Sequence, residues 1–257
     1  MENRFEAGLA FSVAAWPLNP QKSTLVFIHG SGGSNILWDN QVKTFGDRAN
    51  LLALDLPGHG GSPGTAFSTV PEYTRAVMAF IDELKVPKPI PAGLSLGGAI
   101  TLQLLLDYPE RFPAGVLIGT GAKLKVMPMI FETIEKDFPA FVASSKQMTI
   151  SRKTDPALIQ PLLDSNLKSP PQVTFGDFQA CDRFDVRQRL AEIKVPVLVV
   201  SGEDDLLTPP KYAEYLAANI TGARRVHIMD AGHLLPLEKP EELNQALIAF
   251  LDENGLG

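Results

Sequence analysis

The sequence has a single cysteine, Cys181, among its 257 residues, so no disulfide can form within the chain. One cysteine is typical of proteins in a reducing compartment, and its thiol is interpreted as a small buried hydrophobe. No apolar run is long enough to span a membrane. Met1 to Ala7 carry acids where a signal peptide needs basic residues. These absences predict a cytoplasmic protein with no membrane partner.

Positive charge is also scarce, since 23 Lys and Arg face 29 Asp and Glu, for a formal net charge of −6. This balance argues against nucleic acid or an anionic membrane as the main partner. No spacing of Cys, His and carboxylates suggests a metal, and the loop Gly30–Gly33 lacks the lysine of a phosphate loop. We therefore expect no metal and no cofactor. The partner expected is a small molecule, and monomer and homodimer both remain open.

What the sequence does contain is a series of short β-branched and aromatic runs separated by helical patterns. The runs predict buried strands, after an opening hairpin, at 24–28, 51–54, 115–119, 195–200 and 225–229. Helices are predicted at 70–84, at 98–106 with an end near Tyr108-Pro109, and at 241–251. This alternation predicts an α/β fold with a mostly parallel central sheet and helices on both faces.

The sequence pattern changes between residues 122 and 184, where strand-like runs are absent and prolines interrupt helical patterns. We therefore expect an α/β core made of residues 1–121 and 185–257. Residues 122–184 would form a small inserted helical cap. Apolar side chains of this segment could line a substrate pocket or pack the cap itself, and the sequence favours neither. The candidates are Met127, Met129, Ile130, Phe131, Phe138 and Phe141, with Leu94 added from the core.

Ser95 is the candidate nucleophile. It lies in Gly93-Leu94-Ser95-Leu96-Gly97, a Gly-x-Ser-x-Gly pattern between a possible strand at 87–92 and an apolar helix. A serine on so sharp a turn is forced outward, and side chains in place of the flanking glycines would collide with neighbouring backbone. The pattern alone is weak, so it needs partners that follow in the right order.

A serine hydroxyl needs a base near neutral pH, and histidine suits that task. Of four histidines, His233 follows the last predicted strand in a loop, and is assigned as the base. The carboxylate that orients it is expected in Gly202-Glu203-Asp204-Asp205. Asp205 is preferred and Asp204 is the alternative. The oxyanion donors expected are the backbone N–H groups of Leu96 and Ser31, with Gly32 as the neighbouring candidate.

In order and spacing, this set of motifs resembles the α/β-hydrolase superfamily over nearly the whole chain. The resemblance rests on His29-Gly30-Ser31-Gly32, Asp55-Leu56-Pro57-Gly58-His59-Gly60, the Ser95 pentapeptide, Gly202-Glu203-Asp204-Asp205 and Gly232-His233. It implies an α/β-hydrolase fold, an acid third after the strand-end glycine, and a cap after the sixth strand. The small cap resembles those of bacterial carboxylesterases, enol-lactonases and cofactor-free haloperoxidase-like esterases.

Two features depart from the superfamily. Leu94 stands where relatives usually have histidine or tyrosine, and Pro89 and Pro91 fall in what should be a central strand, where a missing N–H is costly. A serine rather than an aspartate at position 95 argues against haloalkane dehalogenases and epoxide hydrolases.

The function predicted is that of a serine hydrolase cleaving carboxylic esters of small to medium acyl groups through an acyl-enzyme. The alternatives are C–C bond hydrolysis, enol-lactone hydrolysis or perhydrolysis by the same triad. A cap residue that binds a carboxylate would favour some of these, and the candidates are Arg152, Lys153 and Arg183. A further alternative is a ligand-binding receptor on a hydrolase scaffold.

Overall fold

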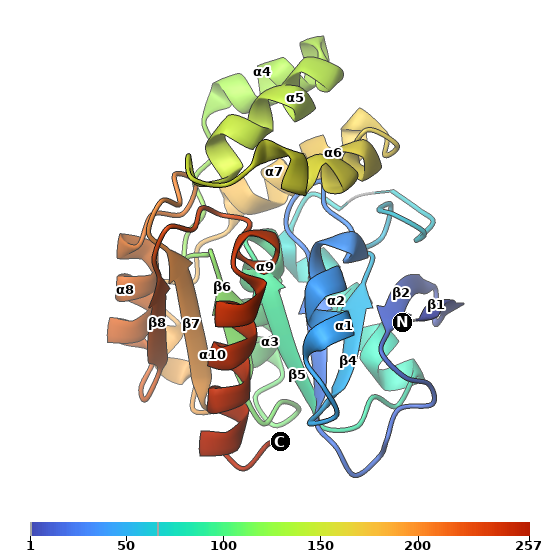
Figure 1. Ribbon diagram of the computed structural model, residues 1–257, viewed down its shortest axis with the longest axis vertical. Helices are drawn as coiled ribbons and strands as arrows, with labels where there is room; N and C mark the ends of the chain where they lie inside the picture. Colours follow the sequence, from blue (N-terminus) through green and yellow to red (C-terminus); the bar gives the residue numbers. More distant parts are fainter. Residues whose placement is uncertain (1, 66) are drawn as a thin grey trace.

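The computed structural model describes residues 2–65 and 67–257. It contains an eight-stranded sheet in the order β1-β2-β4-β3-β5-β6-β7-β8 (Figure 1). β1 and β2 are antiparallel to their neighbours, and the other pairings are parallel. The strands are β1 Glu2–Glu6, β2 Leu9–Val13, β3 Thr24–Ile28, β4 Asn50–Leu54, β5 Pro89–Leu94, β6 Gly115–Ile118, β7 Val197–Gly202 and β8 Arg224–Ile228. The fold class predicted from the sequence is confirmed.

Helices cover both faces of the sheet because alternate strand residues are apolar on both sides. On one face, Val26 and Leu52 pack with α2 Val70–Glu83, α3 Leu96–Asp107 and α8 Lys211–Asn219. On the other face, Phe27 and Ala53 pack with α1 Asp39–Thr44 and α10 Pro240–Glu253. Short helical turns lie at Asn35–Trp38, Pro156–Ile159 and Leu190–Glu192, and α9 spans Leu235–Glu238.

The central strand β5 tolerates its two prolines because neither lies where a backbone N–H would bond to a neighbouring strand. Thr24 N donates to Lys88 O (3.1 Å), so Lys88 faces β3. Adjacent strand residues direct their backbone groups to opposite sides, and Pro89 and Pro91 therefore face the β6 side. Pairing with β6 begins only at Ala92, so neither proline removes a ladder hydrogen bond. The strand thus begins at Pro89 without the cost that a proline has inside a ladder.

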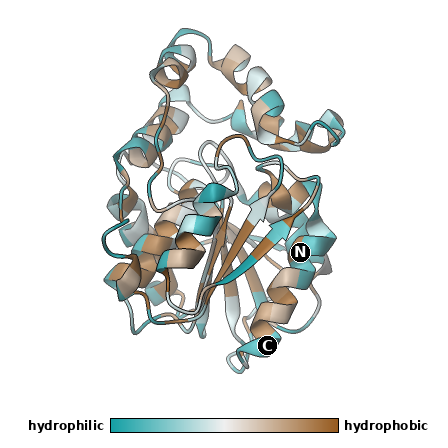
Figure 2. Ribbon diagram, turned by 90° about the vertical axis from the view of Figure 1, so that its left-hand side faces the viewer, coloured by the Kyte–Doolittle hydropathy of each residue, from teal (hydrophilic) through white to brown (hydrophobic). Residues whose placement is uncertain are grey.

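Four helices lie between β6 and β7 in the chain and occupy the region above the carboxyl ends of the strands (Figures 1 and 2). They are α4 Pro128–Lys136, α5 Phe138–Thr149, α6 Gln160–Asn166 and α7 Pro171–Arg183, called here the inserted helices. The segment leaves and rejoins the core at one place, because Val186 N donates to Ala122 O (2.8 Å) and Lys123 bridges to Asp185.

Within the described residues, every helix is too short or too polar to span a bilayer.

Candidate active site

Ser95 occupies the turn between β5 and α3 with an unusual backbone conformation, φ 56° and ψ −113°. A non-glycine residue adopts a positive φ at a cost, and such strain is concentrated at functional sites. Ser95 is fixed there by its own backbone, since its N–H donates to Ile118 O (3.0 Å) and its carbonyl accepts from Thr120 Oγ1 (2.8 Å). The turn therefore presents the serine side chain at the carboxyl edge of the sheet.

The two glycines of the pentapeptide make this turn possible. A Cβ on Gly93 would lie 2.0 Å from the backbone of Gly97, and a Cβ on Gly97 would lie 2.1 Å from Ile28 O. These contacts are with backbone atoms that cannot move aside, so any side chain at either position would push α3 away from the sheet.

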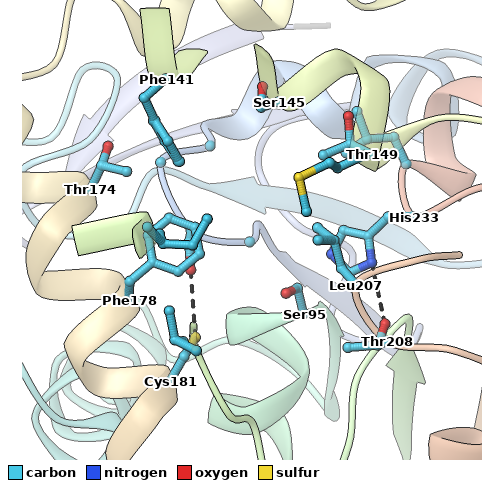
Figure 3. Close-up of a pocket in the computed structure, with 18 of the residues that line it drawn as sticks. Ser95, Phe141, Ser145, Thr149, Thr174, Phe178, Cys181, Leu207, Thr208 and His233 are labelled. Atoms are coloured by element: carbon cyan, nitrogen blue, oxygen red, sulfur yellow. Dashed lines mark hydrogen bonds between the residues drawn. The ribbon is translucent and has the colours of Figure 1, made fainter. Parts of the chain in front are cut away.

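His233 and Asp205 form a buried pair beside the serine turn. His233 Nδ1 lies 2.8 Å from Asp205 Oδ2, and both side chains are nearly inaccessible to solvent. The carboxylate accepts, so the Nδ1 position carries the proton and Nε2 is left as the basic nitrogen. Ser95 and His233 both line one pocket (Figure 3).

Asp205 is held as an acceptor by three further bonds. Oδ1 accepts from the N–H groups of Leu207 (2.9 Å) and Thr208 (2.8 Å), and Oδ2 accepts from Thr208 Oγ1 (2.7 Å). Burial raises the pKa of Asp205. The charge and hydrogen bond of His233, together with two hydrogen bonds from Thr208, outweigh burial and lower the pKa to about 2. Asp204, the alternative from the sequence, instead accepts from Ser151 Oγ.

The N–H of Leu96 lies at the first position of α3, where no helical carbonyl can accept from it. The second predicted donor belongs to the turn Gly30–Gly33, which is closed by Gly33 N donating to Gly30 O (3.0 Å). Within this turn, Gly32 N donates to Asp177 Oδ2 (2.7 Å), so Gly32 is committed elsewhere. The N–H groups of Ser31 and Leu96 have no acceptor among the described residues, which leaves them available to an oxyanion.

The pocket has a volume of about 500 Å³ and lies between the serine turn and the inserted helices. In Figure 3, Phe141 and Phe178 lie on one side of Ser95, and His233 and Leu207 on the other. The basic side chains on its wall, among the described residues, are Lys125 and His233. Lys125 pairs with Asp182 (2.6 Å). The cavity is thus largely apolar, with the serine at one of its walls.

The residues predicted to line the pocket divide into two groups. Leu94, Met127 and Ile130 line it. Phe131 and Phe138 do not: Phe131 packs edge-on against Phe175 (5.1 Å between ring centroids), and Phe138 stacks on Phe141 (6.3 Å). The sequence left both roles open for these two rings, because an apolar residue on an inserted helix serves equally well in a dry core and on an apolar pocket wall.

Sequence reasoning missed Asp177 on α7, a fully buried carboxylate that bonds to the turn carrying Ser31. It also bonds to His59 and Tyr73. The available signal was a lone acid within the otherwise uncharged stretch Val173–Phe178.

A mostly parallel sheet with a serine on a strand-to-helix turn, facing a buried histidine–aspartate pair, defines an α/β hydrolase. The model of the alpha/beta hydrolase family matches residues 25–246. The chain belongs to this family.

Several relatives have known names. A pimeloyl-[acyl-carrier protein] methyl ester esterase from Nitrosomonas europaea is 26% identical over 234 residues, which cover 85% of this chain and 91% of that protein. 3-Oxoadipate enol-lactonase 1 from Acinetobacter baylyi is 27% identical, with 88% of each chain covered. The solved structure of a thermophilic esterase is 32% identical with a TM-score of 0.80, covering 99% of this chain and 98% of that one.

Proposed function

We propose that this chain is a carboxylic ester hydrolase in which Ser95 is the nucleophile, His233 the base and Asp205 its orienting acid. The observation that carries the proposal is the His233–Asp205 bond of 2.8 Å, which leaves Nε2 as the nitrogen that can accept a proton in a pocket that Ser95 shares. Named ester hydrolases among the relatives support the same class.

In this mechanism, Ser95 Oγ attacks the ester carbonyl while His233 Nε2 takes its proton. The negative charge that develops on the carbonyl oxygen is stabilised by the N–H groups of Leu96 and Ser31. His233 then gives its proton to the leaving alcohol, which departs and leaves an acyl-enzyme. Water, deprotonated by the same Nε2, attacks the acyl-enzyme, and the proton returns to Ser95 as the acid leaves.

The pocket supports an uncharged acyl group of small to medium size. It offers mainly apolar walls, and the one lysine or arginine on its described wall, Lys125, is already paired with Asp182. Of the cations considered for binding a carboxylate, Lys153 pairs with Asp230 and Arg183 bonds to Ser68, and neither lines the pocket.

We further propose that residues 122–184 act as a cap on the core formed by 1–121 and 185–257. This segment supplies much of the pocket wall, including Met127, Ile130, Phe141 and Phe178. Acyl selectivity would then be set by this segment, and the chemistry by the core.

A second candidate is lactone hydrolysis, which the enol-lactonases among the relatives favour. A lactone is an internal ester, so the same residues would open it by the same steps. A lactone whose acyl part carries a carboxylate fits less well, because the pocket has no unpaired cation on its described wall.

The deciding experiment is hydrolysis of p-nitrophenyl esters from C2 to C8 by the parent and by Ser95→Ala. Loss of the nucleophile should lower kcat about 10⁶-fold if the three residues act as a unit. Turnover that survives in Ser95→Ala would refute the assignment. A preference for charged acyl groups would refute the substrate class while leaving the nucleophile intact.

A further inference from the structure

The turn that carries Ser31 is held by the inserted helices. Gly32, at φ +66°, donates its N–H to Asp177 Oδ2 on α7 at 2.7 Å. A Cβ on Gly32 would lie only 3.0 Å from Thr174 Oγ1, so α7 packs directly against this turn. With its amide oriented to satisfy both neighbours, Asn166 of α6 also donates to Gly32 O. The conformation of the Ser31–Gly32 segment thus depends on residues outside the core.

Asp177 is fully buried and accepts from three separate segments of the core. Oδ2 accepts from Gly32 N and from His59 Nε2 (2.8 Å), and Oδ1 accepts from the hydroxyl of Tyr73. Every one of these partners is a donor, so the group acts as a carboxylate. Gly32 and His59 share Oδ2, whereas Tyr73 bonds only to Oδ1, so the hold on Gly32 comes from Oδ2.

His59 supplies the charge that balances this carboxylate. Its Nδ1 faces Pro57 O (3.1 Å) and its Nε2 faces Asp177, so both nitrogens are donors and the ring is an imidazolium. Burial lowers the pKa of His59, but the charge and hydrogen bond of Asp177 outweigh it and the net shift is upward. The ring of His29 lies 4.8 Å away and is neutral, because its Nε2 accepts from Leu56 N. Removing one partner of such a buried ion pair strongly destabilises the folded protein, because the other charge is left buried without a partner.

We propose that Asp177 is a positioning residue that sets the oxyanion geometry from within the inserted helices. It holds Gly32, and with it the adjoining N–H of Ser31, at the place where the carbonyl oxygen acquires charge. The inference rests on the proposed function, since it assumes that Ser31 N–H stabilises an oxyanion. A displacement of about 1 Å at such a site can cost about 100-fold in rate.

The test compares Asp177→Ala, Asp177→Asn and Tyr73→Phe. The Asn variant keeps an oxygen opposite Gly32 and His59, since its amide NH₂ is accommodated only on the side of Tyr73. Tyr73→Phe removes one donor to the same carboxylate but leaves the Gly32 bond intact, so it is the matched control. The readouts are kcat and KM for an ester substrate, the rate at which a fluorophosphonate reacts with Ser95, and the urea midpoint of unfolding.

We expect Asp177→Ala to lower kcat and the phosphonylation rate together, by about 30- to 100-fold, with KM changed less than about threefold. Asp177→Asn and Tyr73→Phe should stay within about fivefold of the parent in kcat, even where their urea midpoints fall. If Asp177→Ala does not fold, Asp177→Ala combined with His59→Asn replaces it, because this pair leaves no unbalanced buried cation.

Equal losses of kcat in Asp177→Ala and Tyr73→Phe would overturn the proposal, because the cluster would then act only through stability. An Asp177→Ala variant within threefold of the parent would overturn it as well. A parent that hydrolyses no ester but reacts with the fluorophosphonate contradicts the proposed function alone. The phosphonylation rates of the variants would then decide the role of Asp177.

Discussion

Replacing Asp205 by asparagine should abolish most of the activity, because it moves the proton of His233 from Nδ1 to Nε2. Oδ1 accepts from the backbone N–H groups of Leu207 and Thr208, so the amide oxygen must remain at that position. The NH₂ group then takes the place of Oδ2, opposite Nδ1 of His233 at 2.8 Å. Two donors cannot face each other, so Nδ1 becomes an acceptor and the proton moves to Nε2. Protonated Nε2 cannot take the proton of Ser95.

The expected loss in kcat is about 10⁴-fold, which is the known scale for imposing the wrong histidine tautomer. This corresponds to about 5 kcal/mol in the activation free energy. KM should change little, because Asp205 is behind the histidine and the substrate does not reach it. The measurement is kcat for a short p-nitrophenyl ester near neutral pH, with the urea midpoint checked to show that the variant is folded.

Asp204→Asn is the matched control, since Asp204 is the adjacent acid and bonds to Ser151 instead of His233. Its kcat should stay within about threefold of the parent, as for other changes away from the reacting groups. The reasoning would be refuted if Asp204→Asn proved the more damaged variant. An Asp205→Asn variant that kept a tenth of the parent activity would refute it equally.

Two further predictions concern the pocket and the buried histidine. Phe141→Ala should raise kcat/KM for longer acyl chains by up to about fourfold for each added methylene that the enlarged pocket accommodates. Phe131→Ala, which removes a ring outside the pocket wall, should leave the chain-length profile unchanged, and the reverse pattern would contradict the pocket assignment. Burial and the neighbouring His59 lower the pKa of His29 to about 3. The unfolded chain therefore binds the extra proton below pH 6.5, and the free energy of unfolding should fall by about 1 kcal/mol between pH 6 and 5. His59, whose pKa is raised, is protonated in both states at the acid end of that window and adds little slope there. Urea midpoints measured across this range test the sign, and an unchanged or rising midpoint would count against a neutral buried His29.

Much of the fold could be predicted because buried parallel strands are continuous apolar runs. Val197–Gly202 and Thr24–Ile28 are apolar on both faces, and few other structures suit such short runs. The start of β5 was harder to predict, because Pro89 and Pro91 argue against a central strand. Only the pairing register shows that β6 does not reach them.

The core residues of the candidate site were predictable because each follows a strand, and strands in parallel sheets end at one edge. The residues from the inserted helices were not. Phe131 and Phe141 have the same chemistry, and only packing decides that one faces a partner ring and the other the pocket. Asp177 lies 145 residues from Gly32, so its bond to that glycine leaves no local pattern in the sequence.

The chain leaves the core for the inserted helices and returns to it at one place, where Val186 N donates to Ala122 O. Because the two ends of the segment lie close together, another segment could replace it without disturbing the sheet. The bond from Gly32 to Asp177 limits that freedom. A segment transplanted from another member of the family would need its own acceptor for Gly32 and its own counter-charge for His59. We therefore expect the pocket-lining residues of this segment to vary among members of the family while an acceptor for Gly32 is kept.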